Sequence, residues 1–233
     1  MKKRVDRKNI QILFNRIAGH YDFLNTFLSF GFEKRWRIQF AEMSVNGSER
    51  AILDVGVGTG KTLNALREKN PEAVIVGCDF SEKMLGKAQK KFSTAGFFVT
   101  GDFHELPFAP NSFDLVTGSF VLRSVENMSR FLSEIKRILR PGGRVAFLEL
   151  TRPRNFLFFK LIYQPYLRFY LPAIGGLVSG RRESYQFLSD SIRGFDDPID
   201  FKILMEKNGF DSVIIHPLMN GIVTIIYGEN RPE

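Results

Sequence analysis

The strongest chemical signal in the chain is an acidic residue followed by alternate glycines. The apolar run Ala51 to Leu53 leads into Asp54, and the glycines that follow let the backbone turn tightly and approach a ligand without Cβ atoms in the way. A second acid, Asp79, ends the next apolar run about 20 residues later, which suits a carboxylate that holds a ribose diol. We expect a nucleoside cofactor to be bound by Asp54, Gly56, Gly58, Thr59, Gly60 and Asp79.

The spacing of these glycines distinguishes between two kinds of cofactor site. The pattern Asp-x-Gly-x-Gly-x-Gly departs from the dinucleotide fingerprint G-x-G-x-x-G after Thr59. An ordinary tight connection between a strand and a helix is the alternative, and the position of Asp79 favours the cofactor site. The pair of acids resembles the site of class I S-adenosylmethionine-dependent methyltransferases, in which the first acid helps to place the methionine end and the second holds the ribose hydroxyls.

Strands and helices alternate from Arg50 to Leu150, which predicts a parallel sheet covered on both faces. We expect strands over 51–55, 74–79, 97–100, 113–117 and 144–150, and helices over 61–69, 81–91 and 128–139, with a Pro-Gly-Gly turn at 141–143. Ligands of such sheets lie beyond the carboxyl ends of the strands. We therefore expect the cofactor to contact Asp102, Phe103 and Ser119. Asp102 would accept a hydrogen bond from an adenine amine, and Phe103 would contact the adenine ring. For these two residues, a plain surface turn is the alternative.

The end of the chain distinguishes the expected fold from a dinucleotide-binding domain. A helix over 199–207 precedes two strands over 211–216 and 222–227, joined by a short antiparallel connection. This pair resembles the reversed last strand of class I methyltransferases. The expected fold is α/β and Rossmann-like, with a seven-stranded, mainly parallel sheet whose last strand is reversed.

We expect one class I methyltransferase domain with four parts. They are an N-terminal helical cap (1–48, with helices over 10–21 and 33–43), a cofactor-binding core (49–150), an insertion (151–197) and the last helix and strands (198–233). The insertion holds a dense apolar and aromatic tract over 156–171, and Lys160, Pro165, Arg168 and Pro172 exclude a spanning helix. We expect it to form a helical cap and an apolar wall for a lipophilic substrate.

The net charge of +8 is compatible with binding to nucleic acid, with binding to an anionic membrane surface, or with a role in solubility alone. Basic residues of the insertion could contact anionic lipid headgroups at ~1 kcal/mol each. Nucleic acid is not expected as a partner, because no basic stripe is interleaved with aromatic residues. The N-terminus has no apolar signal core, which predicts a cytoplasmic protein, located at the inner face of the membrane if lipid is contacted. Whether the chain forms a homodimer stays open.

Narrower motifs occur along the whole chain. They include Tyr21-Asp22-x-x-Asn25, Ser29-Phe30-Gly31, Ser119-Phe120-x-Leu122-Arg123, Leu148-Glu149-Leu150 and Ser184-Tyr185-x-x-Leu188-x-x-Ser191-Ile192-Arg193. On these residues the chain resembles the ubiquinone and menaquinone biosynthesis C-methyltransferases. The resemblance implies S-adenosylmethionine as cofactor, bound at Thr59, Asp79, Asp102, Phe103 and Ser119. Lys61 departs from the family pattern, which usually has Asp at that position.

The resemblance implies transfer of a methyl group to a ring carbon beside a hydroxyl of a polyprenylated quinol, either demethylmenaquinol or 2-polyprenyl-6-methoxy-1,4-benzoquinol. Ionising a phenol at pH 7 costs roughly 4 kcal/mol, and a cation at ~4 Å contributes about the same at an effective dielectric of ~20. Arg123 is the candidate polarising residue, with an ordinary salt bridge as its alternative, and Tyr21 is expected to close the site. No metal is expected. The rival functions are methylation of another lipophilic small molecule, RNA methylation and non-catalytic cofactor binding.

Overall fold

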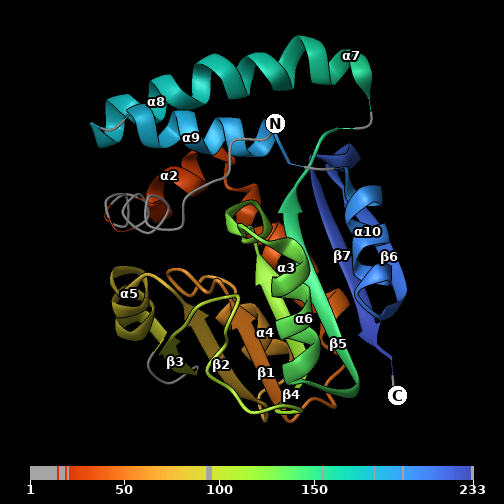
Figure 1. The fold of residues 1–233 in the computed structure, drawn as a ribbon. Coiled ribbons are helices and arrows are strands. Elements are labelled where there is room, and N and C mark those ends of the chain that lie inside the picture. The colour runs from red at the N-terminus through yellow and green to blue at the C-terminus, as the bar shows by residue number, and fades with distance from the viewer. Residues whose placement is uncertain are drawn as a thin grey trace.

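The computed structural model describes residues 15, 19, 21–92, 96–153, 155–180, 182–195 and 197–231. A single seven-stranded sheet runs through the molecule (Figure 1), in the order β3-β2-β1-β4-β5-β7-β6. The strands are β1 (Ala51–Val55), β2 (Val74–Asp79), β3 (Phe97–Thr100), β4 (Phe113–Ser119), β5 (Leu139–Leu150), β6 (Phe210–Leu218) and β7 (Val223–Asn230).

The direction of the strands confirms the expected fold class. Strands β1 to β5 pair in parallel, whereas β7 pairs antiparallel with both β5 and β6. The central strands β1 and β4 are almost wholly buried, because helices cover both of their faces. This arrangement brings the carboxyl ends of β1, β2 and β4 to one edge of the sheet.

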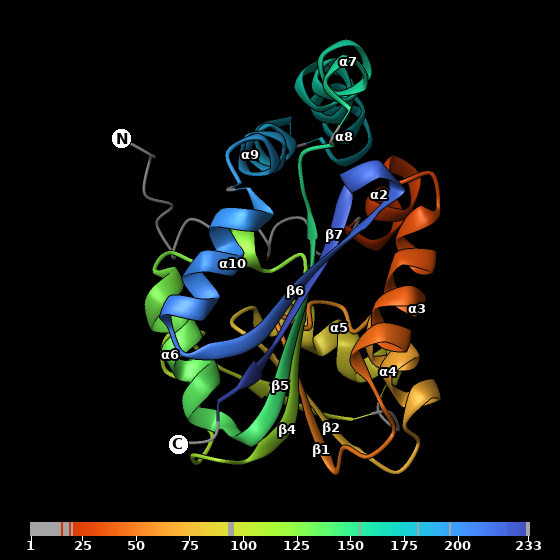
Figure 2. The same ribbon diagram turned by 90° about the vertical axis from the view of Figure 1, so that its right-hand side faces the viewer.

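Helices form a layer on each face of the sheet (Figure 2). Helices α6 (Met128–Ile138) and α10 (Pro198–Lys207) cover one face, and α3 (Phe32–Ser44), α4 (Leu63–Lys69) and α5 (Glu82–Phe92) cover the other. Each layer buries apolar side chains against the strands, with Phe131 and Phe147 in the first core and Ile52 and Leu66 in the second. The sheet is therefore a rigid support for the loops at its edge.

Several expected boundaries were displaced, among them the ends of β4, β6 and β7, and two of the displacements have a clear reason. β5 begins at Leu139 rather than after the Pro-Gly-Gly turn, because Leu139 already pairs with Phe113 and the register then shifts to Leu115 and Arg144. Helix α4 begins at Leu63 rather than Lys61, because the glycine turn continues to residue 62. The helix expected over 10–21 lies mostly outside the described residues.

A cap of helices lies across the carboxyl end of the sheet (Figures 1 and 2). It contains α2 (Tyr21–Leu28), α9 (Arg182–Arg193) and a long helical stretch made of α7 (Phe156–Phe158), two π-helical segments (Phe159–Tyr163 and Tyr166–Tyr170) and α8 (Leu171–Ser179). Pro165 lies between the two π-helical segments; it lacks an N–H, and the wider π turns accommodate such an interruption. None of the helices described here is long and apolar enough to cross a membrane.

Candidate functional site

The glycine turn between β1 and α4 has the backbone conformation expected of it. Gly56, Gly58 and Gly60 all have positive φ angles, which favour glycine. Space is also limited, since a Cβ on Gly56 would lie 2.4 Å from the Val121 side chain. Asp54, just before the turn, is buried and accepts a hydrogen bond from the Thr117 hydroxyl at 2.9 Å. Burial raises the pKa of Asp54 to about 7.

Asp79 connects the end of β2 to the glycine turn. Its carboxylate accepts hydrogen bonds from the backbone N–H groups of Gly58 and Ser81, both at 2.8 Å. Burial raises the pKa of Asp79 to about 6, and these N–H donors act in the opposite direction. Each carboxylate oxygen can accept a second hydrogen bond, so Asp79 can support the turn and still receive a ribose hydroxyl.

A cleft beside this turn collects most of the expected cofactor residues. Its lining includes Gly56, Gly58, Asp79, Phe80, Phe103, Ser119 and Phe120. Phe103 is buried and packs edge-on against Phe80, with ring centroids 5.3 Å apart. Asp102 does not line the cleft: one of its carboxylate oxygens accepts a hydrogen bond from the His104 backbone N–H at 3.0 Å, within a turn.

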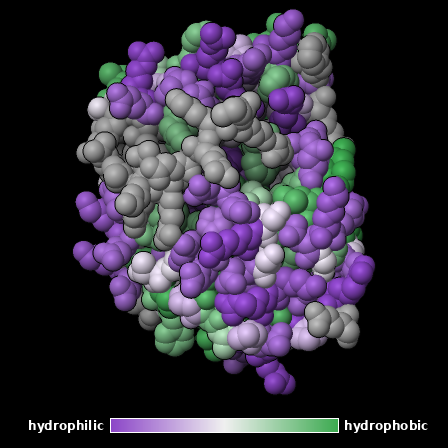
Figure 3. Space-filling view, viewed as in Figure 1, coloured by the Kyte–Doolittle hydropathy of each residue, from purple (hydrophilic) through white to green (hydrophobic). Residues whose placement is uncertain are grey.

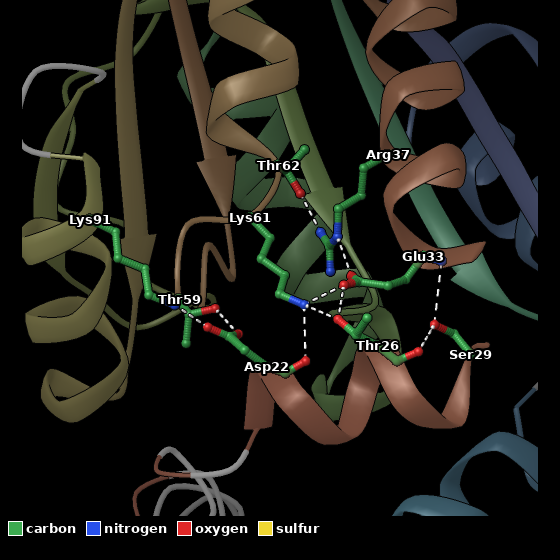
Figure 4. Close-up of polar contacts among 9 residues, drawn as sticks. All are labelled: Asp22, Thr26, Ser29, Glu33, Arg37, Thr59, Lys61, Thr62 and Lys91. Carbon is green, nitrogen blue, oxygen red and sulfur yellow. Dashed lines mark hydrogen bonds and ion pairs between the residues drawn. The ribbon is translucent and has the colours of Figure 1, made fainter. Parts of the chain in front are cut away.

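Helix α2 is attached to the cofactor turn through a polar network (Figure 4). The Thr59 hydroxyl donates to Asp22 on α2 at 2.5 Å, and Asp22 also pairs with Lys91 of α5. Lys61 donates to Glu33, to the Thr26 hydroxyl and to the Asp22 carbonyl oxygen. The lysine that departs from the family pattern is thus paired with a carboxylate from α3.

Arg37 extends this network from α3 to the cleft. It donates from Nε to Glu33 at 3.2 Å and from Nη1 to the Thr62 hydroxyl, which in turn donates to Ser119 at 3.1 Å. Its guanidinium also lies 5.1 Å from the centre of the Phe120 ring. Arg37 is almost fully buried, and its charge lowers the pKa of Asp54 against the larger effect of burial.

An apolar cavity of about 380 Å³ lies between the cap and the end of the sheet. Its lining includes Leu28, Phe30, Trp36, Leu150, Tyr163, Tyr166, Leu188, Ile192 and Met219. Trp36 of this cavity packs edge-on against Phe120 of the cofactor cleft, with centroids 6.5 Å apart. Phe120 has a positive φ of 60°, a conformation that costs a non-glycine residue energy and often marks functional sites. The linings of the two spaces therefore meet at this aromatic pair.

Arg123 lies behind this cavity in a buried ion pair. Its Nε donates to Glu149 at 2.7 Å, and its Nη1 donates to the Ser191 hydroxyl of α9 at 3.3 Å. Glu149 is fully buried, and its second oxygen, Oε2, has no hydrogen-bond partner among the described residues. The charges of Arg123 and Glu149 both act on the cavity-lining Tyr163, whose pKa is raised chiefly by burial. The salt bridge that the sequence offered as the alternative for Arg123 is present.

The structure adds functional candidates that the sequence did not single out. Phe120 and Tyr163 line the two cavities. Asp22, Glu33 and Arg37 belong to the polar network around the glycine turn, and Glu149 pairs with Arg123. Asp22, Phe120 and Glu149 belong to the narrow sequence motifs, so the sequence could have indicated them. Arg37 belongs to none of these motifs. The described part of Tyr21 is its backbone, so its expected role stays a prediction. In the part of the chain that the structure describes, no cluster of three or more His, Cys, Asp or Glu side chains could hold a metal ion.

Comparisons with known proteins place the chain among methyltransferases. It is 38% identical to a demethylmenaquinone methyltransferase from Thermotoga maritima over 96% of each chain. It is also 38% identical to a ubiquinone/menaquinone biosynthesis C-methyltransferase from Geotalea daltonii, over 95% of this chain and 96% of the relative.

Solved structures confirm the fold. An S-adenosylmethionine-dependent methyltransferase from Thermotoga maritima has a TM-score of 0.65 at 20% identity and covers 94% of this chain and 98% of its own. Human N-acetylserotonin methyltransferase has a TM-score of 0.61 at 18% identity over 90% of this chain and 55% of its own. A model of one sequence family matches residues 1–230. The chain belongs to the ubiE/COQ5 methyltransferase family.

Proposed function

We propose that the protein transfers the methyl group of S-adenosylmethionine to a ring carbon of a polyprenylated quinol. The observation that carries this proposal is the apolar cavity beside the cofactor cleft, because Trp36 of the cavity lining contacts Phe120 of the cleft lining. A cavity of about 380 Å³ fits an aromatic ring and the first part of an isoprenoid tail better than a polar substrate. The printed functions of the relatives, demethylmenaquinone and ubiquinone/menaquinone C-methylation, support the same substrate class.

The residues of the cleft fit the proposed cofactor. Asp79 would hold the ribose hydroxyls and Phe103 would contact the adenine. Asp102, next to Phe103 in sequence but outside the lining, is proposed as the acceptor for the adenine amine, and Asp54, before the glycine turn, would place the methionine end. The turn of Gly56, Gly58, Thr59 and Gly60 brings the backbone close to the ligand, and Ser119 lines the cleft near Thr62. When bound, S-adenosylmethionine supplies an electrophilic methyl group on a sulfonium ion.

The chain's own contribution to the chemistry is to ionise the quinol and hold it. We assign Arg123 to stabilise the negative charge on the quinol oxygen, and Glu149 to accept the hydroxyl proton on its unpartnered Oε2. Tyr163 lines the cavity and the charges of both residues act on it, so we assign its hydroxyl to relay the proton. The ring carbon would then gain the methyl group, and its own proton would pass to the quinol oxygen, which restores both the aromatic ring and the hydroxyl. Glu149 would release the first proton to solvent when the product leaves. The apolar walls exclude water from the reacting atoms.

The decisive experiment incubates the purified protein with S-adenosylmethionine and a reduced, short-tailed demethylmenaquinol or 2-polyprenyl-6-methoxybenzoquinol. Product mass and ring position are then measured. Methylation on the ring carbon of either quinol is the expected result, and the preferred quinol identifies the pathway. Methylation on oxygen, or cofactor binding without methylation of either quinol, would contradict the proposed reaction.

We also propose that the cap contacts an anionic membrane at its cytoplasmic face. The long helical stretch of the cap exposes several large apolar side chains, whereas the exposed face of a surface helix normally carries polar ones. The exposed apolar residues are Leu157, Leu161, Ile162, Phe169 and Leu177. The upper rim of Figure 3, over this cap, shows hydrophobic side chains among strongly hydrophilic ones.

The charge of this surface favours lipid over a second copy of the chain. Lys160 and Arg168 flank the apolar residues and are exposed, and the sequence has no acidic residue between Glu149 and Glu183. A second copy would bring the same positive charges, whereas anionic headgroups would pair with them. Ile162, Phe30 and Met219 line the apolar cavity and are also exposed, so the cavity is open to the surface.

A further inference from the structure

The polar network of Figure 4 carries more positive than negative charge. It contains three cationic side chains, Arg37, Lys61 and Lys91, and two carboxylates, Asp22 and Glu33. Burial raises the pKa of Glu33, but Arg37 and Lys61 outweigh it and lower the pKa overall, so this carboxylate is charged at neutral pH. One further negative charge would make the network neutral.

Arg37 is the cation with hydrogen-bonding capacity left. The ammonium group of Lys61 has three N–H donors, and all three are used by Glu33, Thr26 and the Asp22 carbonyl oxygen. Arg37 has five N–H donors and uses Nε and Nη1. Within the described part of the chain, its Nη2 makes no hydrogen bond.

The unused N–H donors of Arg37 lie close to the cofactor cleft. Its hydrogen-bond partner Thr62 reaches Ser119, and its guanidinium faces Phe120; both Ser119 and Phe120 line the cleft. Its charge also acts on Asp54, at the end of β1. Phe103, the residue expected at the adenine, packs against Phe80 in the same lining. Arg37 is thus close to the part of the cleft where the methionine portion would lie.

We infer that Arg37 binds the α-carboxylate of the methionine portion of S-adenosylmethionine. The inference rests on the proposed cofactor and is independent of the quinol. A guanidinium can donate two parallel hydrogen bonds to a carboxylate, and burial strengthens such a pair. The added carboxylate would offset the excess positive charge of the five charged side chains in the network. Glu33 and Thr62 then act as positioning residues, because they hold the guanidinium at a fixed angle.

Two ligands that differ only in this carboxylate test the inference. The affinities of S-adenosylmethionine and of its decarboxylated analogue are measured by calorimetry for the wild type, Arg37→Met and Arg37→Gln. Arg35→Met, an exposed arginine on the same helix, is the control. We expect Arg37→Met to bind S-adenosylmethionine roughly 10- to 100-fold more weakly, while the affinity for the decarboxylated analogue changes by less than about threefold. Arg37→Gln should lose most of the same preference, and Arg35→Met none.

The ratio of the two affinities separates a binding role from a structural one. A variant that is partly unfolded binds both ligands more weakly by the same factor, so the ratio stays at the wild-type value. An unchanged ratio in both Arg37 variants, with a wild type that binds S-adenosylmethionine, would overturn this inference and leave the proposed function intact. Failure of the wild type to bind S-adenosylmethionine would overturn both.

Discussion

At the scale of single residues, the buried carboxyl group of Asp54 makes stability depend on pH. Its pKa is about 7 in the folded chain and near 3.8 in the unfolded chain, so the folded state holds the proton more tightly between these values. Stability from this group is therefore full below about pH 4 and is lost as pH rises through 7. The neutral variant Asp54→Asn can still accept the Thr117 hydrogen bond.

We expect the stability difference between Asp54→Asn and the wild type to grow in favour of the variant from pH 4 to pH 8. The full pKa difference corresponds to up to roughly 4 kcal/mol. Urea unfolding at several pH values measures this difference in the free energy of unfolding. Carboxylates with a lowered pKa, such as Asp22 and Glu33, contribute equally to both proteins, so their contributions cancel in the difference. A difference that stays constant with pH would show that Asp54 is ionised in the folded protein.

The Arg123 and Glu149 pair allows a second test at this scale. Removing one partner leaves a buried charge, so Glu149→Leu or Arg123→Leu should each destabilise the fold by about 3–5 kcal/mol. Replacing both by leucine removes both charges and should recover most of this stability, as thermal unfolding would show. We expect the double variant to fold and to bind S-adenosylmethionine, but to methylate a quinol at least roughly 100-fold more slowly.

The conservative variant Glu149→Gln refines this test. It keeps a hydrogen-bond acceptor for Arg123 but cannot take the hydroxyl proton in the same way, so turnover should fall and its dependence on pH should change. Near wild-type turnover in the double leucine variant would show that the pair has only a structural role.

The sequence predicted some of these residues and missed others for a physical reason. Gly56, Gly58 and Asp79 belong to a local pattern in which strand, turn and acid follow one another, and the cleft brings them together. Arg37 contacts Thr62 across 25 positions, and Glu149 contacts Arg123 across 26. Such pairs depend on how helices and strands pack, and no local spacing indicates them.

At the scale of elements, α2 closes over the cofactor turn through side chains from two other segments. Asp22 stands in the first turn of α2, where a carboxylate also favours the helix dipole, and it pairs with Thr59 and Lys91. The aromatic residues Phe23 and Phe27 of this helix stack on each other and are exposed. Polar contacts therefore hold much of this short helix in place.

We expect Asp22→Asn to loosen α2 without affecting the sheet. Amide hydrogen exchange over 21–28 should become roughly 5- to 20-fold faster, which corresponds to losing about 1–2 kcal/mol of charge-assisted hydrogen bonding. Exchange in β1 and β4 should not change. Glu42→Gln is the matched control, because its partner Lys69 and Glu42 are both exposed. Equal effects of the two variants on 21–28 would contradict a specific role for Asp22.

A comparison of the expected and observed strands and helices shows which sequence patterns predict structure well. The central strands were predicted to within about two residues, because burial on both faces requires continuous apolar runs. The cap was predicted as helical, but its unbroken passage through Pro165 was not, because tolerance of proline depends on local π-helical geometry. The strand β5 crosses its Pro-Gly-Gly segment because pairing with β4 starts early.

At the scale of the whole molecule, the cap, the apolar cavity and the cofactor cleft follow one another. The cap carries the exposed apolar residues and also lines the cavity, and the Trp36 and Phe120 pair joins the cavity lining to that of the cleft. A quinol with a long isoprenoid tail partitions strongly into a bilayer. A protein that docks with its cap on the membrane can therefore bind the quinol ring while the tail remains in lipid.

This arrangement predicts that binding to vesicles and turnover of long-tailed substrates depend on the same surface. The double variant Leu157→Glu/Leu161→Glu places charges where apolar side chains would enter the interface, and should bind anionic vesicles at least roughly 10-fold more weakly. Ile199→Glu, an equally exposed position on α10, is the control and should bind like the wild type. Co-sedimentation at low and high salt measures the binding, which salt should weaken because Lys160 and Arg168 contribute.

The same variants distinguish membrane docking from a defect in the site. Turnover of a water-soluble, short-tailed quinol should be unchanged in Leu157→Glu/Leu161→Glu, because neither leucine lines the cavity. Turnover of a long-tailed quinol presented in anionic vesicles should fall with vesicle binding. If the wild type does not bind anionic vesicles at low salt, or if the variant loses both activities equally, the membrane-docking role of the cap is wrong. If only the long-tailed substrate is affected, the cap is the route by which the quinol leaves the bilayer and reaches the cofactor.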